Sequence, residues 1–233
     1  MYIFYTPDLS TSFELPLEEA QHCMRVLRLK ERDEIQLTDG LGHFFKAVIT
    51  IASPKHCKVE ILETTTQDLP WKNQIHIALA PTKNMDRNEW FAEKATEIGI
   101  NQISFLNCRY SERKEIKIER IEKILISAMK QSQKATLPKL QGMTDFKLFI
   151  SRHFDGQKFI AHCDPGEKML LSHAYNKGQN ALVLIGPEGD FSKEEVAWAI
   201  KNGFQPVSLG ESRLRTETAA LTACQTIHII NIL

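Results

Sequence analysis

Apolar residues recur in this chain at two different spacings. From residue 74 onward, short apolar runs alternate with stretches in which apolar residues return every three or four positions. Short runs are typical of buried strands, and the wider spacing is typical of helices with one buried face. The predicted strands are 75–80, 102–106, 159–162, 181–185 and 206–209, and the predicted helices are 86–98, 117–134, 193–201 and 216–230. This alternation favours an α/β fold, with a largely parallel sheet covered by helices on both faces.

The first 70 residues follow a different pattern. A helix is predicted over 16–27, where apolar residues recur at the helical period. The strand-like runs that follow are 34–38, 43–51 and 57–62. Gly40 and Gly42 lie between the first two of these runs and indicate a hairpin turn. This part of the chain is therefore expected to be rich in β-structure.

The stretch 63–70 separates the two patterns. It has no apolar period and ends in proline, so it is the predicted linker. With 233 residues, the chain is long enough for two modest domains. We therefore expect a small β-rich domain over 1–70 and an α/β domain over 71–233.

Two loops with glycine follow predicted strands of the second domain. The first, 186–192, reads GPEGDFS after the run 181–185, and the second, 210–218, reads GESRLRTET after the strand 206–209. Because glycine has no Cβ, such loops can offer backbone N–H and C=O groups to a planar ligand. Either loop could equally be an ordinary strand-to-helix turn, since glycine is the usual turn residue.

The sequence also indicates how helices begin after these loops. Ser192 and Glu195 have the spacing of a capping box for the helix 193–201, and Thr216 can begin the last helix.

The two loops lack the patterns of phosphate-binding loops. Neither G-x-x-x-x-G-K-[ST] nor G-x-G-x-x-G occurs between a predicted strand and a predicted helix. Both loops carry acidic residues, namely Glu188, Asp190, Glu211 and Glu217. Carboxylates suit a cationic or neutral ligand better than a polyphosphate.

Composition narrows the function classes further. The chain contains no run of about 18 apolar residues and begins without the basic region of a signal peptide, so we expect a cytoplasmic protein with no membrane contact. The five cysteines form no C-x-x-C pair and the eight histidines form no H-E-x-x-H, so neither a disulfide framework nor a metal site is predicted. His162, Cys163 and Asp164 are adjacent, but neighbours on a strand point to opposite faces, so we expect separate strand-end residues here.

Basic residues are unevenly distributed, although the net charge is zero. Residues 1–70 hold seven Lys and Arg against eleven Asp and Glu, and residues 71–233 hold twenty-two against eighteen. No acid occurs between Glu122 and Asp145, which leaves a local basic face that is either solvated or in contact with nucleic acid. The candidate phosphate-binding residues are Arg25, Arg28, Lys30 and Arg32 in the first domain and Arg109, Arg113, Lys114, Lys123, Lys130 and Lys134 in the second.

The two loops resemble those of a known family. LIGPEGDFSKEE and SLGESRLRTETAA are similar to the two C-terminal motifs of the bacterial 16S rRNA uracil-N3 methyltransferases, which belong to the SPOUT (knotted) methyltransferases. Similar segments also occur at 83–89, 94–100, 131–132 and 137–138. The resemblance covers nearly the whole chain, weakly over the first seventy residues and strongly thereafter.

This resemblance implies a fold and a set of partners. It implies a SPOUT domain with a C-terminal trefoil knot, an N-terminal PUA-like β-barrel that binds RNA, and a homodimer. The strand and helix pattern alone predicts an unknotted doubly wound sheet. The implied cofactor is S-adenosylmethionine and the implied substrate is 16S rRNA or the small ribosomal subunit. The residues expected to bind the cofactor are Ile185, Gly186, Glu188, Gly189, Leu209, Gly210, Leu214, Arg215 and Thr216.

Methylation of uracil N3 makes chemical demands that suggest catalytic residues. As N3 loses its proton, negative charge spreads onto O2 and O4, and a fixed cation beside them lowers the barrier. Arg215 is the first candidate for this cation and Arg87 the second. Glu217 is a candidate general base, although a carboxylate at a helix start can instead cap N–H groups. Because N3 lies on the Watson–Crick edge, the target uridine has to be unpaired or flipped out.

The chain also departs from the family pattern. Many relatives have Glu and Arg where this chain has Lys130 and Lys134, and a basic residue followed by an apolar one at Ser212 and Arg213. Lysine cannot reproduce the planar fork of arginine, so a bidentate contact is not expected at Lys134.

Two other functions stay open at this point. One is a SPOUT methyltransferase acting on a ribose 2′-OH of tRNA or rRNA, and the other is a non-catalytic RNA-binding protein of ribosome assembly. Nucleoside analysis of the methylated RNA distinguishes ribose methylation from base methylation. RNA binding without methyl transfer would indicate the assembly protein.

Overall fold

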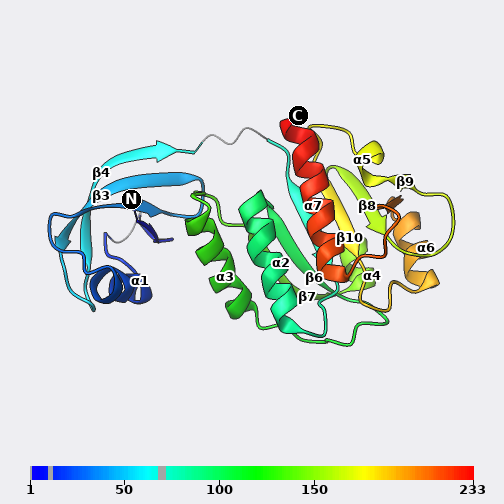
Figure 1. Cartoon of the computed structure of the whole chain (residues 1–233), viewed down its shortest axis with the longest axis horizontal. Coiled ribbons are helices and arrows are strands. Elements are labelled where there is room, and N and C mark those ends of the chain that lie inside the picture. Colours follow the sequence, from blue (N-terminus) through cyan, green and yellow to red (C-terminus); the bar gives the residue numbers. More distant parts are fainter. Residues whose placement is uncertain (1, 10–12, 68–71) are drawn as a thin grey trace. The chain divides into compact units, whose positions relative to one another are not determined.

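The computed structural model describes residues 2–9, 13–67 and 72–233 (Figure 1). It separates into two compact units. One takes in the chain up to residue 69 together with 126–137, and the other takes in 70–125 and 138–233. We call them the N-terminal unit and the C-terminal unit. The sequence did not indicate that 126–137 would fold with the N-terminal unit.

The N-terminal unit contains a four-stranded sheet. Its strands, in spatial order, are β1 (Ile3–Tyr5), β2 (Glu34–Thr38), β3 (His43–Ile51) and β4 (Lys58–Thr66). β1 pairs parallel to β2, and the other two pairs are antiparallel. The hairpin turn predicted at Gly40 and Gly42 is confirmed by the pairing of β2 with β3. The predicted linker was partly wrong, because residues up to Thr66 pair with β3, while 68–70 lie outside the described residues.

One helical segment and the returning chain complete the N-terminal unit. The helix α1 (Leu17–Gln21) continues into a π-helical segment η1 (His22–Val26), as the apolar period over 16–27 predicts. Buried side chains from these helices and from the strands form one core, for example Ala20, Ile35 and Ile49. The segment after residue 131 runs beside the hairpin turn, where Gly42 N donates to Ala135 O at 2.9 Å.

The C-terminal unit is built on a seven-stranded sheet in which all pairs are parallel. In spatial order its strands are β7 (Lys139–Asp145), β6 (Gln102–Asn107), β5 (Ile75–Leu79), β10 (Ala181–Ile185), β8 (Gln157–Ala161), β11 (Gln205–Ser208) and β9 (Met169–Leu170). The predicted parallel sheet is confirmed. The two edge strands, β7 and β9, were not predicted.

Helices cover both faces of this sheet (Figure 1). The helices are α2 (Met85–Ile98), α3 (Ile118–Gln131), α4 (Phe146–Ile150), α5 (Leu171–Ala174), α6 (Lys193–Lys201) and α7 (Thr216–Ile232), of which α3 contributes residues to both units. α2 and α7 pack together, and α7 lies against β5 and β10. On the other face, Ala78 and Leu184 share a core cluster with Phe146 of α4 and Val196 of α6. The two-sided covering matches the prediction, and the trefoil knot stays a prediction from the family resemblance.

Two local predictions were also tested by the structure. The capping box at α6 is confirmed, with Ser192 N bonded to Glu195 Oε2 at 2.8 Å and Glu195 N bonded to Ser192 Oγ at 3.2 Å. The helix predicted over 117–134 ends earlier, at Gln131. In the described part of the chain, no helix has both the length and the apolar character needed to cross a membrane.

Candidate cofactor pocket

The loops that follow β10 and β11 meet at one edge of the sheet. Parallel strands bring their carboxyl ends to the same edge, where ligands of open α/β sheets usually bind. Here the buried hydroxyl of Thr216, at the start of α7, donates to Gly186 O, directly after β10, at 3.1 Å. This bond joins residues that lie thirty positions apart in the chain. The two loops therefore lie beside each other.

A cavity of about 430 Å³ opens beside these loops. This volume lies in the range typical of small-molecule sites, on the order of 300–1,000 Å³. Its walls come from the chain after β8, from the loop after β10 and from the segment that leads from β11 to α7. The lining residues are Ala161, His162, Cys163, Asp164, Pro165, Lys168, Asp190, Val207, Ser208, Leu209, Gly210, Glu211, Ser212, Arg213, Leu214 and Ala219.

Asp190 ties two of these walls together. Its Oδ2 accepts a hydrogen bond from Cys163 N at 2.7 Å, and its Oδ1 accepts one from Phe191 N at 2.8 Å. Its own N–H donates to Pro187 O at 2.9 Å. Asp190 adopts φ of 64°, a left-handed conformation that few non-glycine residues show. Both carboxylate oxygens thus fix backbone. At the neighbouring Gly189, an added Cβ would lie 3.1 Å from Cβ of Tyr110.

Two glycines of these loops have different roles. Gly186 lies where a side chain would be too close to its neighbours, and Gly210 lies where there is open space. A Cβ on Gly186 would lie 3.1 Å from Phe191 N and 3.2 Å from Asp190 Oδ1, which is closer than ordinary van der Waals contact. Gly210 has φ of 127°, and no atom lies within 4 Å of the position of its absent Cβ. The first glycine therefore permits a tight return of the chain. The second leaves open space where a side chain would be, while its N–H and C=O bond Ser208 Oγ.

The structure corrects the prediction for the segment after β8. His162, Cys163 and Asp164 were expected to be separate strand-end residues, yet all three line the cavity. β8 ends at Ala161, so the alternation of faces along a strand no longer applies to them. The ammonium of Lys168 holds this turn closed by donating to His162 O at 2.8 Å and to Asp164 O. Burial lowers the pKa of His162, and the charge of Lys168 lowers it further.

Only some of the predicted cofactor residues border the cavity. Leu209, Gly210 and Leu214 line it. Ile185, Gly186 and Thr216 are buried, and Glu188, Gly189 and Arg215 are exposed. Glu188 Oε1 accepts a hydrogen bond from Lys83 N at 3.0 Å, so this carboxylate holds the loop before α2. The missed lining residues could have been found from one signal, their place directly after the carboxyl end of a buried parallel strand.

Two of the predicted catalytic residues form a pair. Nε of Arg87, in the first turn of α2, lies 3.6 Å from Oε1 of Glu217, whose side chain is only 9% exposed. Among the described residues, Glu217 Oε2 has no hydrogen-bond partner. The alternative was that Glu217 caps helix N–H groups. In the described structure, the Glu217 carboxylate accepts no hydrogen bond from a helix N–H group. Arg215 is the N-cap residue of α7, and its exposed side chain makes no capping bond.

Several of the predicted RNA-binding residues have partners inside the protein. Arg113 Nε donates to Thr82 O at 3.0 Å, and its Nη2 donates to Lys83 O. Arg109 Nη1 lies 3.3 Å from Glu194 Oε2. Within the N-terminal unit, Lys130 Nζ lies 2.5 Å from Glu19 Oε1, with side chains 19% and 11% exposed. Of the remaining candidates, Lys134 is half-buried beyond the end of α3, and the others are exposed: Arg25, Arg28, Lys30, Arg32, Lys114 and Lys123. Lys114 Nζ donates to Asn107 Oδ1 at 3.1 Å.

Comparison with known proteins defines the class to which this fold and site belong. A family model described as an RNA methyltransferase domain matches residues 69–228, and one described as an RNA methyltransferase PUA domain matches residues 15–62. The chain therefore belongs to the RNA methyltransferase family that these domains define. The matches confirm the resemblance of the loop sequences.

Individual relatives narrow the family further. Ribosomal RNA small subunit methyltransferase E of Buchnera aphidicola is 30% identical over 97% of this chain and 92% of the relative. The crystal structure of a probable rRNA-methyltransferase from Porphyromonas gingivalis is 46% identical, with a TM-score of 0.95 over 100% of this chain and 99% of that one. Ribosomal RNA small subunit methyltransferase E from Neisseria gonorrhoeae, bound to S-adenosyl methionine, is 28% identical, with a TM-score of 0.87 over 99% and 98%.

Proposed function

We propose that this protein methylates N3 of a uridine in small-subunit ribosomal RNA, with S-adenosylmethionine as the methyl donor. Family membership and full-length similarity to ribosomal RNA small subunit methyltransferase E support the class of reaction and of RNA. The choice of uracil N3 is supported by the two loop motifs. The observation that carries the proposal is the Thr216–Gly186 bond, which joins these motifs beside one cavity.

The residues around the cavity fit the proposed cofactor. Its lining holds three acidic side chains, Asp164, Asp190 and Glu211, against the basic Lys168 and Arg213. This balance suits a ligand with a positive charge. The cofactor would supply a methyl group on a positively charged sulfur. The attacking nitrogen would bond to this methyl group, and the sulfur would leave as a neutral thioether.

Backbone and apolar side chains would hold the adenosyl part. Leu209 and Leu214 line the cavity and would pack against the faces of the adenine. Gly210 leaves room beside them, and its N–H and C=O are bonded to Ser208 Oγ at 3.2 Å and 3.1 Å. Gly186 and Thr216 fix the distance between the loops and need not touch the ligand. Glu188 likewise has a structural role, since its carboxylate accepts a hydrogen bond from Lys83 N.

The chemical step assigns three polar residues to the substrate. The exposed guanidinium of Arg215 would stabilise the negative charge that spreads over O2 and O4. Glu217 would accept the N3 proton, with Arg87 orienting its carboxylate through the 3.6 Å contact. Replacing Glu217 by Gln should therefore remove a limb of the pH–rate profile, while Arg215→Lys should lower kcat and keep that limb.

Partners and location follow from the same proposal. RNA contacts are assigned to the exposed Arg25, Arg28 and Lys123, with secondary contacts from Arg109, Arg113 and Lys134. Lys130, which the sequence also suggested, is held in its ion pair with Glu19. We also propose that the protein is cytoplasmic and forms a homodimer. One chain has a mass of 26.6 kDa, and a dimer should sediment with twice that mass.

Mass spectrometry of ribosomal RNA nucleosides tests the proposal. A deletion strain should lose 3-methyluridine from its small-subunit RNA, and the wild-type gene should restore it, whereas the Arg215→Ala variant should not. Unchanged 3-methyluridine contradicts the proposal. Loss of a 2′-O-methylated nucleoside instead would indicate a ribose methyltransferase, and RNA binding without any methyl transfer would indicate an assembly protein.

A further inference from the structure

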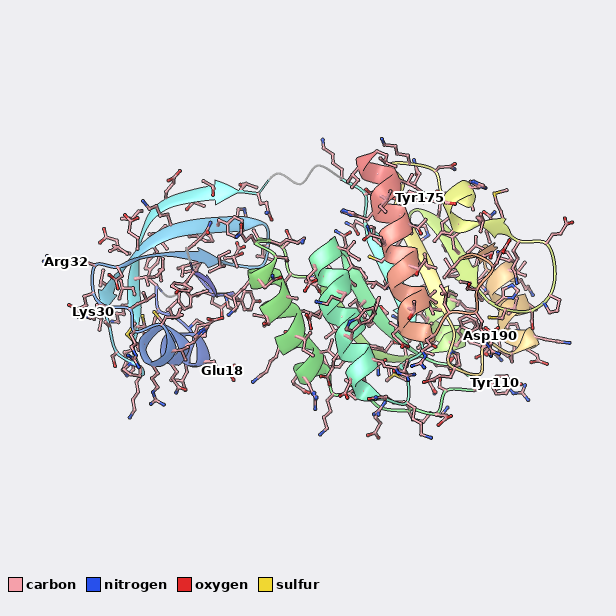
Figure 2. All side chains as sticks on the ribbon, in the orientation of Figure 1. Glu18, Lys30, Arg32, Tyr110, Tyr175 and Asp190 are labelled. Carbon is pink, nitrogen blue, oxygen red and sulfur yellow. The ribbon has the colours of Figure 1, made fainter. Side chains whose placement is uncertain are left out.

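The turn between η1 and β2 presents basic side chains in a regular order. We call residues 27–33 the arginine turn. Leu27 and Leu29 pack against the core of the N-terminal unit, and the residues between and after them, Arg28, Lys30 and Arg32, are exposed. Lys30 and Arg32 project from the turn, away from the strands of the unit (Figure 2). Apolar anchors thus alternate with outward-facing cations as far as Lys30, and the exposed Glu31 separates Lys30 from Arg32.

Two arginines of this turn have an unusual backbone conformation. Arg28 has φ of 57° and Arg32 has φ of 74°. Among the described non-glycine residues, only Gln133 and Asp190 share this left-handed region. Glycine adopts this region readily and asparagine tolerates it, whereas a long side chain is disfavoured there. Such residues persist only where the surrounding structure holds them, and they cluster at functional sites.

Backbone hydrogen bonds outside the arginine side chains hold the turn. Leu29 N donates to Cys23 O at 3.2 Å, and Arg32 N donates to Ile49 O at 2.8 Å. Asp33 closes the turn, because its Oδ2 accepts from Lys30 N at 2.7 Å. The guanidinium groups are therefore not needed for the path of the chain, and glycine would suit both arginine positions better.

Charge is concentrated here in an otherwise acidic region. Residues 1–70 contain seven basic residues against eleven acidic ones, and four of the seven lie within residues 25–32. Two acids also lie in the turn, so its formal net charge is +1: Glu31 is exposed between Lys30 and Arg32, and Asp33 accepts from Lys30 N. No hydrogen bond or ion pair to a described residue occupies the side chains of Arg28 and Arg32. Two guanidinium groups are thus held in water on a fixed backbone.

We propose that the arginine turn is a preorganised site for the phosphate backbone of the RNA substrate, with Arg28 and Arg32 as its two principal contacts. The planar guanidinium fork matches phosphate oxygens, and a fixed backbone reduces the ordering cost of binding. Contacts of this kind position the RNA without reading its sequence. The inference rests on the proposed function, which makes ribosomal RNA the substrate.

The double variant Arg28→Gly/Arg32→Gly separates backbone strain from charge. Glycine relieves the left-handed positions, so the melting temperature should rise by about 2–4 °C. Transcribed small-subunit ribosomal RNA should bind about tenfold more weakly at 0.1 M salt. Because two phosphates are then no longer neutralised, the slope of log affinity against log salt should become shallower by about 1.4 for single-stranded RNA and about 1.8 for a duplex. A merely structural turn would change stability and leave this slope unmoved.

Two control variants accompany this measurement. Arg28→Lys/Arg32→Lys keeps the cations and the backbone strain, so the salt slope should stay within error of the wild type. Lys55→Gln removes an exposed cation elsewhere in the same unit and should change neither the slope nor the affinity.

The outcomes distinguish this inference from the proposed function. If the glycine variant is as stable as the wild type or more so, and binds RNA with unchanged affinity and slope, the arginine turn is not an RNA site. Methyl transfer from labelled cofactor to the same RNA by the wild type tests the proposed function separately. A wild type without methyl transfer whose RNA binding still depends on the two arginines would overturn the enzyme assignment and keep the arginine turn.

Discussion

The cofactor loops and the arginine turn use left-handed or tightly packed backbone in opposite ways. In the loops, glycine stands at Gly186 and Gly210, and the one left-handed non-glycine residue described there, Asp190, uses its carboxylate to hold backbone. In the turn, Arg28 and Arg32 stand where glycine would be easier. A glycine motif thus marks a site where the backbone path matters, whereas a strained arginine marks a site where the side chain itself matters.

The two units also differ in the buried polar groups that stabilise them. The N-terminal unit buries an ion pair between Lys130 and Glu19. The C-terminal unit buries neutral groups, such as His76, whose Nε2 lies 2.8 Å from Ser104 Oγ. The C-terminal unit also buries the carboxylates of Glu195 and Glu217, so the contrast concerns these two sites and not the whole units.

The largest expected effect comes from breaking the buried ion pair. Lys130→Met leaves the carboxylate of Glu19 buried and unpaired, so the free energy of unfolding of the N-terminal unit should fall by about 3–5 kcal/mol. Calorimetry resolves this as a lower transition temperature of that unit. The double variant Glu19→Leu/Lys130→Met should recover most of this stability. An equal decrease in both variants would show that packing, and not charge, holds this region.

Burial of the neutral His76 side chain predicts that the folded state loses stability in acid. Burial lowers the pKa of His76 to about 4, whereas the unfolded chain keeps a value near 6.5. Between these values the unfolded state binds more protons, so the stability present above pH 6.5 is lost as the pH falls through 4. The loss should be on the order of 3 kcal/mol in urea denaturation curves. His76→Gln should flatten this part of the stability profile, and an unchanged profile would contradict the assignment.

If the backbone path shapes the pocket, substitutions at Gly186 and Glu188 should affect cofactor binding to different extents. Gly186→Val should weaken cofactor binding at least about 100-fold, or about 2.7 kcal/mol, because a side chain there meets Phe191 and Asp190. Glu188→Gln keeps an oxygen for the Lys83 N–H and should change affinity less than about threefold. Calorimetric titration with S-adenosylmethionine compares them. A larger effect from Glu188→Gln would reverse this part of the comparison.

A smaller effect is expected at the bond between the loops. Thr216→Val removes the donor to the buried Gly186 carbonyl, which should cost about 1–2 kcal/mol and lower cofactor affinity about tenfold. Thr216→Ser keeps the hydroxyl and serves as the matched control. Equal affinity in both variants, measured in the same titration, would show that the bond does not shape the pocket.

The sequence predicts the fold well where the apolar pattern is strong. The strands 34–38, 43–51 and 181–185 and the helix 193–201 have the predicted bounds. The missed elements are short or polar: β7 contains Gln141, Gly142 and Thr144, and β9 has two residues. Such segments become strands because neighbouring strands pair with them, which no local period records.

The site shows the same limit. The two glycine loops were visible in the sequence because their motifs are local. Asp190 was noted only as an acid, and its bond to Cys163 N joins residues 27 positions apart. The strain at Arg28 and Arg32 is likewise imposed by bonds to Cys23 and Ile49, so it appears only in the folded chain.

Nuclear magnetic resonance of glycine-labelled protein can locate the bound cofactor. The chain has 11 glycines, and on addition of S-adenosylmethionine the amide resonances of Gly186, Gly189 and Gly210 should shift. Those of Gly40 and Gly42, in the hairpin of the N-terminal unit, should stay in place. Shifts confined to these two hairpin glycines, or no shift at all with excess ligand, would contradict a cofactor pocket between the loops after β10 and β11.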